Sequence, residues 1–522
     1  MEKGLRLSLV LGLLLCQGGR SELQTVCPYR CQCFTASQVL CADERMSALP
    51  GNMSRQVKDF IVMTSSVAYL FSHSLEESPQ LTRLVFLNNA LRSVHAQAFE
   101  HLTELRELEI SGNPWLESLF LGTFSNQGNL TVLLLNFNRL KTVLPGLFDS
   151  LKQLEVLQMK SNIISSLPPL LFLNLNNLRV LDLSQNKLEE VKRETLCGLA
   201  KLEILKVNNN LISSLQSDTF SNVSQLTELH LEGNRLTQLA DDTFSELKNL
   251  QVLNLRGNLL RSFSDKVFGS EPSDLKELNL KGNRLIELSS LSSLTSLTDL
   301  ILSSNRLLNL TEDTFRNVTA LENLDLSENQ LTSLPTNLFR DLFRIKALHL
   351  HSNNLSTVDA KLFEDQMLIQ QLYLSNNQLE TLPAGLFDLF ATQHTMRLHG
   401  NPWRCDCHMW YLHDWVQRSG QDIEMLDRVL CESPLFLRRR TVVSVDRDQL
   451  VCHLSKAGVP DLNACSLQAS NDTVTVRCKA HRCSPVTVKV QFVEEDGTTT
   501  EHILKNDPKY SQCSNKEVLE SP

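Results

Sequence analysis

Apolar residues recur along most of the chain at a fixed spacing. The pattern L-x-x-L-x-L-x-x-N-x-L first appears clearly from Leu81 to Leu91, with Phe86 at one leucine position and Asn89 at the asparagine position. The asparagine returns at residues 113, 138, 162, 186, 210, 234, 258, 283, 305, 329, 353, 377 and 401. These 13 steps cover 312 residues, a mean period of 24, and a degenerate copy with Ser65 lies one period earlier. The sequence therefore predicts an array of about fifteen similar units.

Each unit predicts a short strand followed by a return segment. Alternate apolar positions around L-x-L point inward, and stacked units align their strands into one parallel sheet on a concave wall. The asparagine follows the strand, where its amide can satisfy backbone groups that have lost their sheet partners. This pattern is typical of the leucine-rich repeat, so the expected fold is an α/β solenoid, a horseshoe whose concave face is parallel β-sheet.

A second apolar series predicts the packing of the convex side. A phenylalanine follows the repeat asparagine by about ten residues in most units, from Phe99 to Phe387, and Leu196 takes its place once. We interpret this series as core. The unit between Asn283 and Asn305 has only 22 residues and lacks the phenylalanine, so it is the predicted site of an irregularity.

Cysteines cluster outside the repeats. Twelve of the fourteen form three groups of four, which predicts disulfides at Cys27, Cys31, Cys33, Cys41, Cys405, Cys407, Cys431, Cys452, Cys465, Cys478, Cys483 and Cys513. Each group allows three pairings. Zinc is the alternative for the first two groups, but the C-x2-C spacing of zinc ribbons is absent. Cys197 lies outside these groups, and three alternatives are open for it: a free thiol, an interchain disulfide or a buried sulfur.

The composition along the chain predicts five segments. They are a secretory signal (1–21), a cysteine-rich cap (22–56), the repeats (57–400), a second cysteine-rich cap (401–452) and a small β-rich tail (453–522). The signal, the disulfides and the N-x-[ST] motifs indicate a secreted glycoprotein without a membrane span. The predicted glycosylation sites are Asn52, Asn129, Asn222, Asn309, Asn317, Asn354 and Asn471.

Charge and motifs argue against several functions. The net charge is −9 and the pI is about 5.9, so nucleic-acid binding is not expected. The order of the zinc ligands in carboxypeptidases is matched by His101, Glu104 and His230. At least five repeats separate the two histidines, which is roughly 24 Å at a strand spacing of about 4.8 Å. They are therefore too far apart to bind one zinc ion. No nucleophile elbow, phosphate loop or dinucleotide motif appears. We therefore expect no catalytic site, cofactor or metal.

Solvent-facing strand positions are the candidate partner contacts. Near the N-terminal end they include Val85, Leu87, Leu134 and Phe137, which are unusually apolar for exposed positions. Toward the C-terminal end, Tyr373 and Arg397 lie among histidines, and aromatic and arginine side chains are common in binding hot spots. The alternative is that these residues only decorate the surface.

The caps extend the likeness to a narrower family. Cys27-Pro28-x-x-Cys31-x-Cys33, Val85-Phe86-Leu87-Asn88 and the cap from Leu398 to His408, together with the cysteine-bearing tail, resemble the regulatory subunits of carboxypeptidase N. The resemblance implies a secreted plasma protein that binds and stabilises a catalytic zinc metallocarboxypeptidase subunit. That subunit removes C-terminal Lys or Arg from circulating peptides, in a heterotetramer of two heterodimers. The alternatives are a carrier similar to the acid-labile subunit or a decoy receptor similar to Toll-like ectodomains.

Overall fold

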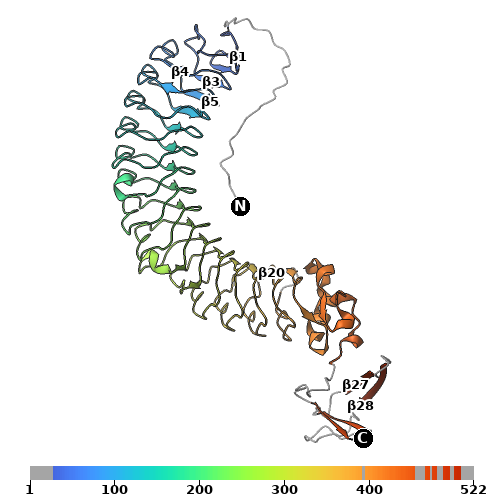
Figure 1. Cartoon of the computed structure of the whole chain (residues 1–522). Helices are drawn as coiled ribbons and strands as arrows, with labels where there is room; N and C mark the ends of the chain where they lie inside the picture. The colour runs from blue at the N-terminus through green and yellow to red at the C-terminus, as the bar shows by residue number, and fades with distance from the viewer. Residues whose placement is uncertain are drawn as a thin grey trace. The chain divides into compact units, whose positions relative to one another are not determined.

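The computed structural model describes residues 27–390 and 394–452, and the backbone of four strands in the tail. The predicted signal, Asn471, Cys483 and Cys513 lie outside the described residues. The chain divides into two compact units, Met1–Arg235 (unit 1) and Leu236–Pro522 (unit 2). Figure 1 shows that each unit is built from successive turns of chain that each contribute a short strand.

Unit 1 begins with a hairpin and continues as a parallel stack. β1 (Cys31–Thr35) pairs antiparallel with β2 (Gln38–Cys41), and β2 pairs in parallel with β3 (Asp59–Met63). The stack then runs through β5 (Arg83–Leu87), β7 (Glu107–Ser111), β8 (Val132–Leu134), β9 (Val156–Gln158), β10 (Val180–Asp182), β11 (Ile204–Lys206) and β12 (Glu228–His230). On the return side lie β4 (Tyr69–Leu70), β6 (Ser93–Val94) and the 3-10 helix η1 (Arg193–Leu196).

Unit 2 is also a parallel stack in which each repeat contributes one strand. Its stack is β13 (Val252–Asn254), β15 (Glu277–Asn279), β17 (Asp299–Ile301), β18 (Asn323–Asp325), β19 (Ala347–His349), β20 (Gln371–Tyr373) and β21 (Thr395–Arg397). The return side holds β14 (Ser262–Phe263), η2 (Asp265–Phe268) and β16 (Glu287–Leu288). β14 and β16 pair with each other; β16 lies in the return segment of the 22-residue unit and β14 in that of the preceding repeat.

The C-terminal cap closes the stack of unit 2. Its strands are β22 (Trp403–Arg404), β23 (Ile423–Glu424) and β24 (Cys431–Ser433), and β23 pairs with β21. Its helices are η3 (Cys407–Met409), α1 (Trp410–Ser419), η4 (Gly420–Asp422), η5 (Leu426–Arg428), η6 (Leu435–Leu437), η7 (Val442–Ser444) and η8 (Arg447–Gln449). Among the residues that the structure describes, none of the helices has the length and hydrophobicity of a membrane span.

The tail, predicted to be β-rich, contains two antiparallel pairs of strands. β25 (Cys465–Ser470) pairs antiparallel with β26 (Thr473–Cys478), and β27 (Val486–Val493) pairs antiparallel with β28 (Thr499–Asn506).

The asparagine series forms the predicted polar ladder inside the stack. Asn186 Nδ2 donates to the carbonyls of Met159 (2.9 Å) and Leu183 (3.0 Å), and its Oδ1 accepts from the amide of Ile164 (3.1 Å). The side chain is buried. One amide thus satisfies three backbone groups from two consecutive repeats, which is why asparagine recurs at this point of the period.

The phenylalanine series is core, as predicted. The rings of Phe99, Phe124, Phe148 and Phe172 stack in sequence, with centroids 6.2–6.4 Å apart. Leu196, which replaces the next phenylalanine, is buried as well. The offset contacts of these rings add to the burial of their area in holding successive repeats together.

One backbone feature repeats before every ladder asparagine. The preceding residue has a positive φ of 50–72° in each unit, from Thr64 to Gly400. Glycine takes this position five times, since it adopts that conformation without steric cost. At Gly112, a Cβ atom would lie 2.0 Å from Asn88 Oδ1, so that turn also requires the absence of a side chain.

Candidate partner-binding surface

The cap cysteines form four disulfides. Cys27 pairs with Cys33, Cys31 with Cys41, Cys405 with Cys431, and Cys407 with Cys452. These pairings are one of the three possibilities in each group, which the sequence left open. Cys197 is a half-buried free thiol whose Sγ lies 3.2 Å from Asn222 Nδ2.

The compact group of metal-ligand-type side chains in the described residues is not suited to hold a metal ion. Asp406, Cys407, His408 and Cys452 bring four ligand-type atoms together. Two of them are the sulfurs of a disulfide, which cannot act as thiolate ligands. His101 is exposed on a return segment, whereas His230 ends β12 between Glu228 (3.3 Å) and Glu232 (3.8 Å). The carboxypeptidase-like ligand order is therefore a coincidence of sequence.

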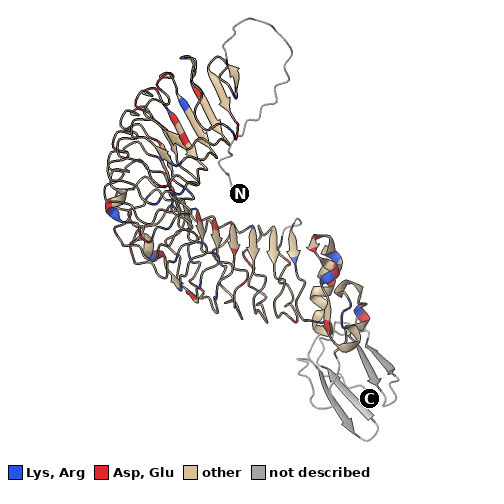
Figure 2. Cartoon of the chain, turned by 45° about the horizontal axis from the view of Figure 1, so that its top comes forward, with Lys and Arg blue, Asp and Glu red and all other residues tan. Residues whose placement is uncertain are grey.

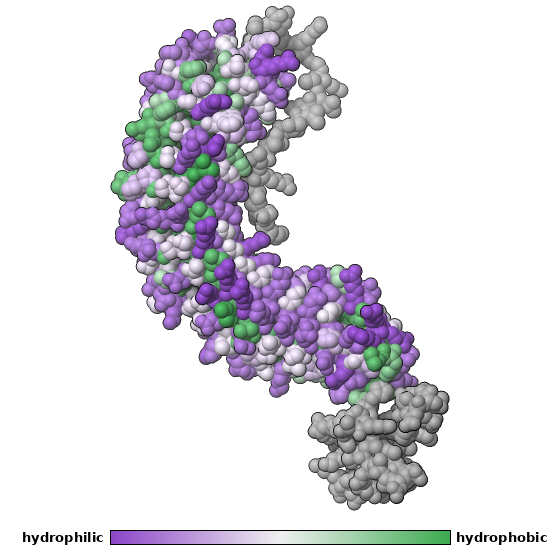
Figure 3. All heavy atoms as spheres, in the orientation of Figure 1, coloured by the Kyte–Doolittle hydropathy of each residue, from purple (hydrophilic) through white to green (hydrophobic). Residues whose placement is uncertain are grey.

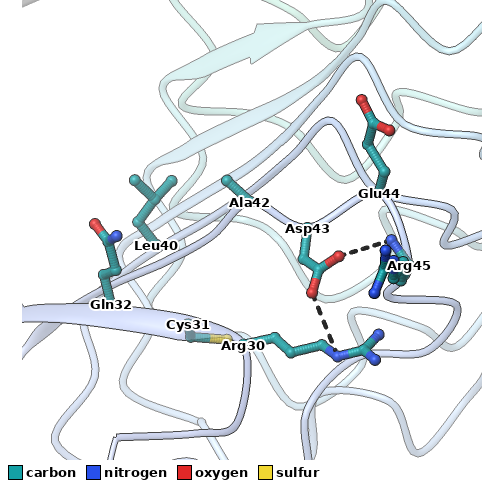
Figure 4. A pocket seen from close by; sticks show the side chains of 8 residues that line it. All are labelled: Arg30, Cys31, Gln32, Leu40, Ala42, Asp43, Glu44 and Arg45. Atoms are coloured by element: carbon teal, nitrogen blue, oxygen red, sulfur yellow. Dashed lines mark hydrogen bonds and ion pairs between the residues drawn. The ribbon is translucent and has the colours of Figure 1, made fainter.

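An open cavity of about 580 Å³ lies in the N-terminal cap. Figure 4 shows the Asp43 carboxylate between the Arg30 side chain and Arg45. Arg30 Nε lies 3.3 Å from Asp43 Oδ2, and Asp43 Oδ1 accepts a hydrogen bond from the backbone amide of Arg45 (2.8 Å). The lining also includes the disulfide-bonded Cys31. This arrangement holds the cap together and offers no pairing of a nucleophile with a base.

The first strands of unit 1 carry a short charged row. Arg83 lies 3.3 Å from Asp59 and 3.0 Å from Glu107, on the two neighbouring strands. Figure 2 shows this alternation of red and blue across adjacent strands. Burial raises the pKa of the nearby Glu109. The row sets one cation between two carboxylates, so it keeps a net negative charge.

The four apolar candidate residues of unit 1 differ in their solvent exposure. Val85 is only 3% exposed, so the expectation that it faces a partner is wrong. It lies between Ile61 and Glu109 of the neighbouring strands, whose longer side chains cover it. Leu87 and Leu134 are half-buried, while Phe137 is 56% exposed. Figure 3 shows hydrophobic surface residues gathered in patches on this unit.

The candidates of unit 2 form a stacked cluster. The Tyr373 ring is 8% exposed, which corrects the expectation of an open contact. It lies 4.5 Å from the parallel ring of His349 and 4.0 Å from the Arg397 guanidinium. Arg397 Nε in turn lies 2.6 Å from Glu424 Oε2. Burial lowers the pKa of His349, His351 and His399.

The predicted glycosylation motifs lie on accessible backbone wherever the structure describes them. Asn52, Asn129, Asn309, Asn317 and Asn354 are exposed, and Asn222 is half-buried. Asn129 and Asn222 both precede strands, β8 and β12 respectively. Glycosylation at these positions remains a prediction.

Sequence reasoning missed one exposed aromatic side chain. Trp115 is 52% exposed and lies in the turn after β7. It belongs to the tetrapeptide Gly112-Asn113-Pro114-Trp115, which recurs as Gly400-Asn401-Pro402-Trp403. Trp403 is fully buried, with its Nε1 donating to the Leu398 carbonyl (3.1 Å). The same four residues therefore place a tryptophan in the core of the cap, within β22, and on the surface of unit 1, within a turn.

Known proteins show the same repeat. The family model described as "Leucine rich repeat" matches residues 152–212, 200–260, 224–285, 248–307 and 295–355. The repeats of this chain are leucine-rich repeats. A leucine-rich repeat protein of Leptospira interrogans has a similar structure, with 27% identity and a TM-score of 0.62 over 74% of this chain and 94% of that chain. A chain of the Drosophila Toll–Spatzle complex is similar in fold only. Its sequence identity is 20%, and its TM-score is 0.64 over 82% of this chain and 66% of that chain.

Two curated relatives resemble the chain more narrowly. Carboxypeptidase N subunit 2 of Homo sapiens is 36% identical over 61 residues, 12% of this chain and 11% of that protein. The Mus musculus protein of the same name is 33% identical over 142 residues, 23% and 25% of the two chains. The matches thus span at most a quarter of these relatives. Over these stretches the chain is similar to carboxypeptidase N subunit 2, and it contains leucine-rich repeats.

Proposed function

We propose that this chain is a secreted, non-catalytic scaffold that binds and stabilises a zinc metallocarboxypeptidase chain. The observation that carries the proposal is the similarity to carboxypeptidase N subunit 2 in two species. The capped repeat stacks support it, because they offer an extended surface rather than an enclosed reaction site. In this proposal the partner removes C-terminal Lys or Arg from circulating peptides, and two heterodimers associate.

Leu87, Leu134 and Phe137, here called the concave patch, are the proposed contacts in unit 1. Phe137 is the most exposed of the three. Large aromatic side chains that lose their solvent on binding often supply much of the binding free energy.

Co-purification of the full chain from plasma tests the proposal. We expect the captured partner to release C-terminal Lys or Arg from peptides, and sedimentation to give two copies of each chain. Leu134→Asp and Phe137→Asp should each weaken capture about tenfold or more, because a buried unpaired carboxylate is costly at an interface. Leu144→Asp, on the return side and 39% exposed, is the matched control. Capture of a growth factor or a microbial pattern ligand in place of a carboxypeptidase would reject the proposal in favour of a carrier or a receptor.

A further inference from the structure

Two exposed aromatic side chains lie on the same edge of unit 1. β7 ends at Ser111 and β8 at Leu134, and the turns that follow them carry Trp115 and Phe137. Because the strands are parallel, these turns lie side by side at the carboxyl edge of the sheet. Their exposed fractions, 52% and 56%, are large for side chains of this size.

Each of these rings has a cation over it. The Arg92 guanidinium lies 5.5 Å from the centre of the Trp115 ring, and Lys160 Nζ lies 5.9 Å from the centre of the Phe137 ring. Arg92 and Lys160 come from the preceding and the following repeat, respectively. The contacts hold the rings in place at the surface, and they leave the cations available for further partners.

The same edge has an excess of positive charge. Arg139 and Lys141 both lie against Glu117, at 3.6 Å and 2.5 Å. The hydrogen bond from Lys141 lowers the pKa of Glu117 and keeps it ionised. Arg92 and Lys160, which lie over the two rings, add two more cations to this edge, although the whole chain has a net charge of −9. We call Arg92, Trp115, Phe137, Arg139, Lys141 and Lys160 the edge site.

Phe137 is held in a backbone conformation that its side chain disfavours. Its φ is +54°, at the position before a ladder asparagine where the other repeats have glycine, asparagine, serine, threonine, glutamine or glutamate. A bulky residue in this region is strained. Every repeat adopts this conformation, so the fold imposes it, and at Phe137 it places a large aromatic side chain at the exposed edge.

Predicted sugars do not cover the edge site. Asn129 precedes β8 and its Nδ2 donates to the Thr103 carbonyl (3.0 Å), at the amino edge of the strands. The sequence from residue 130 to residue 221 contains no N-x-[ST] motif. The edge site therefore has no predicted glycosylation motif among its own residues.

We propose that the edge site binds an acidic segment of the metallocarboxypeptidase chain, with carboxylates on the four cations and an apolar side chain between Trp115 and Phe137. Charge complementarity selects this occupant, because a basic segment would be repelled and an uncharged one would leave the cations without partners. This inference rests on the proposed function and names the chemistry of its contact.

Charge reversal in the full glycosylated chain tests the proposal. Arg92→Glu/Lys160→Glu should weaken binding of the metallocarboxypeptidase chain at least tenfold and flatten its dependence on salt. Phe137→Asn should also weaken binding while the variant stays at least as resistant to heat, which separates binding from folding. Lys248→Glu/Arg261→Glu, two exposed cations of unit 2, is the matched control, with an expected change below twofold.

The outcomes distinguish the two proposals. If the unaltered chain does not bind the metallocarboxypeptidase, the proposed function fails. If it binds and the edge-site variants bind within twofold of it, the edge site is overturned while the function stands. A fluorescent peptide of alternating Asp and Leu gives a second readout, and it should bind more tightly than its Lys–Leu counterpart. Equal affinity for both peptides would contradict the assigned chemistry.

Discussion

At the scale of single residues, Phe137 combines a proposed binding role with a cost to stability. Its positive φ places Cβ close to the following carbonyl, a conformation that costs about 1–2 kcal/mol for most residues. Asparagine adopts the same conformation at Asn88, Asn209 and Asn376. We predict that Phe137→Asn raises the free energy of unfolding by about 1 kcal/mol, measured by urea denaturation. The reciprocal change, Asn209→Phe, should lower it by a similar amount, and equal stability of both variants would show that the position is unstrained.

Three half-buried histidines of unit 2 predict an acid-sensitive fold. Burial lowers the pKa of His349, His351 and His399 from the ordinary 6.5, with Arg397 acting in the same direction and Asp325 or Glu424 opposing it. As pH falls through about 6.5, the unfolded chain takes up protons before the folded chain does. Stability should therefore be complete above that pH and decline below it.

Thermal denaturation of unit 2 at pH 7.5 and pH 5.5 checks this prediction. The variant His349→Gln/His351→Gln/His399→Gln should show a smaller loss of melting temperature on acidification than the unaltered chain. His101→Gln, at an exposed position, should leave the loss unchanged. An identical loss in the triple variant would assign the acid sensitivity to other groups.

Sequence alone predicts little of the surface at this scale. The repeat identifies Val85 and Tyr373 as solvent-facing, yet both are buried because neighbouring side chains on the same face cover them. It gives the same environment to Trp115 and Trp403, yet Trp115 is exposed in a turn and Trp403 is buried in β22. Exposure depends on side chains one repeat away in space, and a period of 24 residues does not specify their conformation.

At the scale of the secondary-structure element, most of the structure can be predicted from the sequence repeat. Strand register follows from the 24-residue period, since Leu181 pairs with Leu157 and Leu205. The buried asparagine and phenylalanine series follow from the same spacing. The cysteine pairings do not, because every pairing within a group is compatible with its spacing.

The asparagine ladder makes each repeat sensitive to one side chain. In Asn186→Leu, the carbonyls of Met159 and Leu183 and the amide of Ile164 lose their partners. A buried unsatisfied group costs about 1–3 kcal/mol, so we predict a loss of about 3 kcal/mol or more in the free energy of unfolding. Hydrogen exchange should increase most in β9 and β10. Asn208→Ala, at a half-buried position, should change stability by less than about 0.5 kcal/mol, and a similar effect of both substitutions would contradict the role of the ladder.

The C-terminal cap protects the end of a stack that would otherwise expose a strand edge. β23 covers β21, and the disulfides Cys405–Cys431 and Cys407–Cys452 hold the cap segments together. Removing a native disulfide from a small secreted domain typically costs about 2–5 kcal/mol. We predict that Cys405→Ala/Cys431→Ala speeds hydrogen exchange in β20 and β21 and leaves β8 unchanged. Uniform exchange across the chain would show that the cap does not act locally.

At the scale of the whole molecule, the arrangement of chemical groups predicts a chain that binds but does not hydrolyse. Removing a basic C-terminal residue with zinc requires three ligands around one ion. In the described residues the single compact group of ligand-type side chains includes two disulfide sulfurs. We predict that the purified chain, supplied with zinc, releases no Lys or Arg from basic-ended peptides. Adding the metallocarboxypeptidase chain should restore release, and its half-life at 37 °C should lengthen at least severalfold. Hydrolysis that comigrates with the isolated chain through repeated chromatography would contradict a scaffold role.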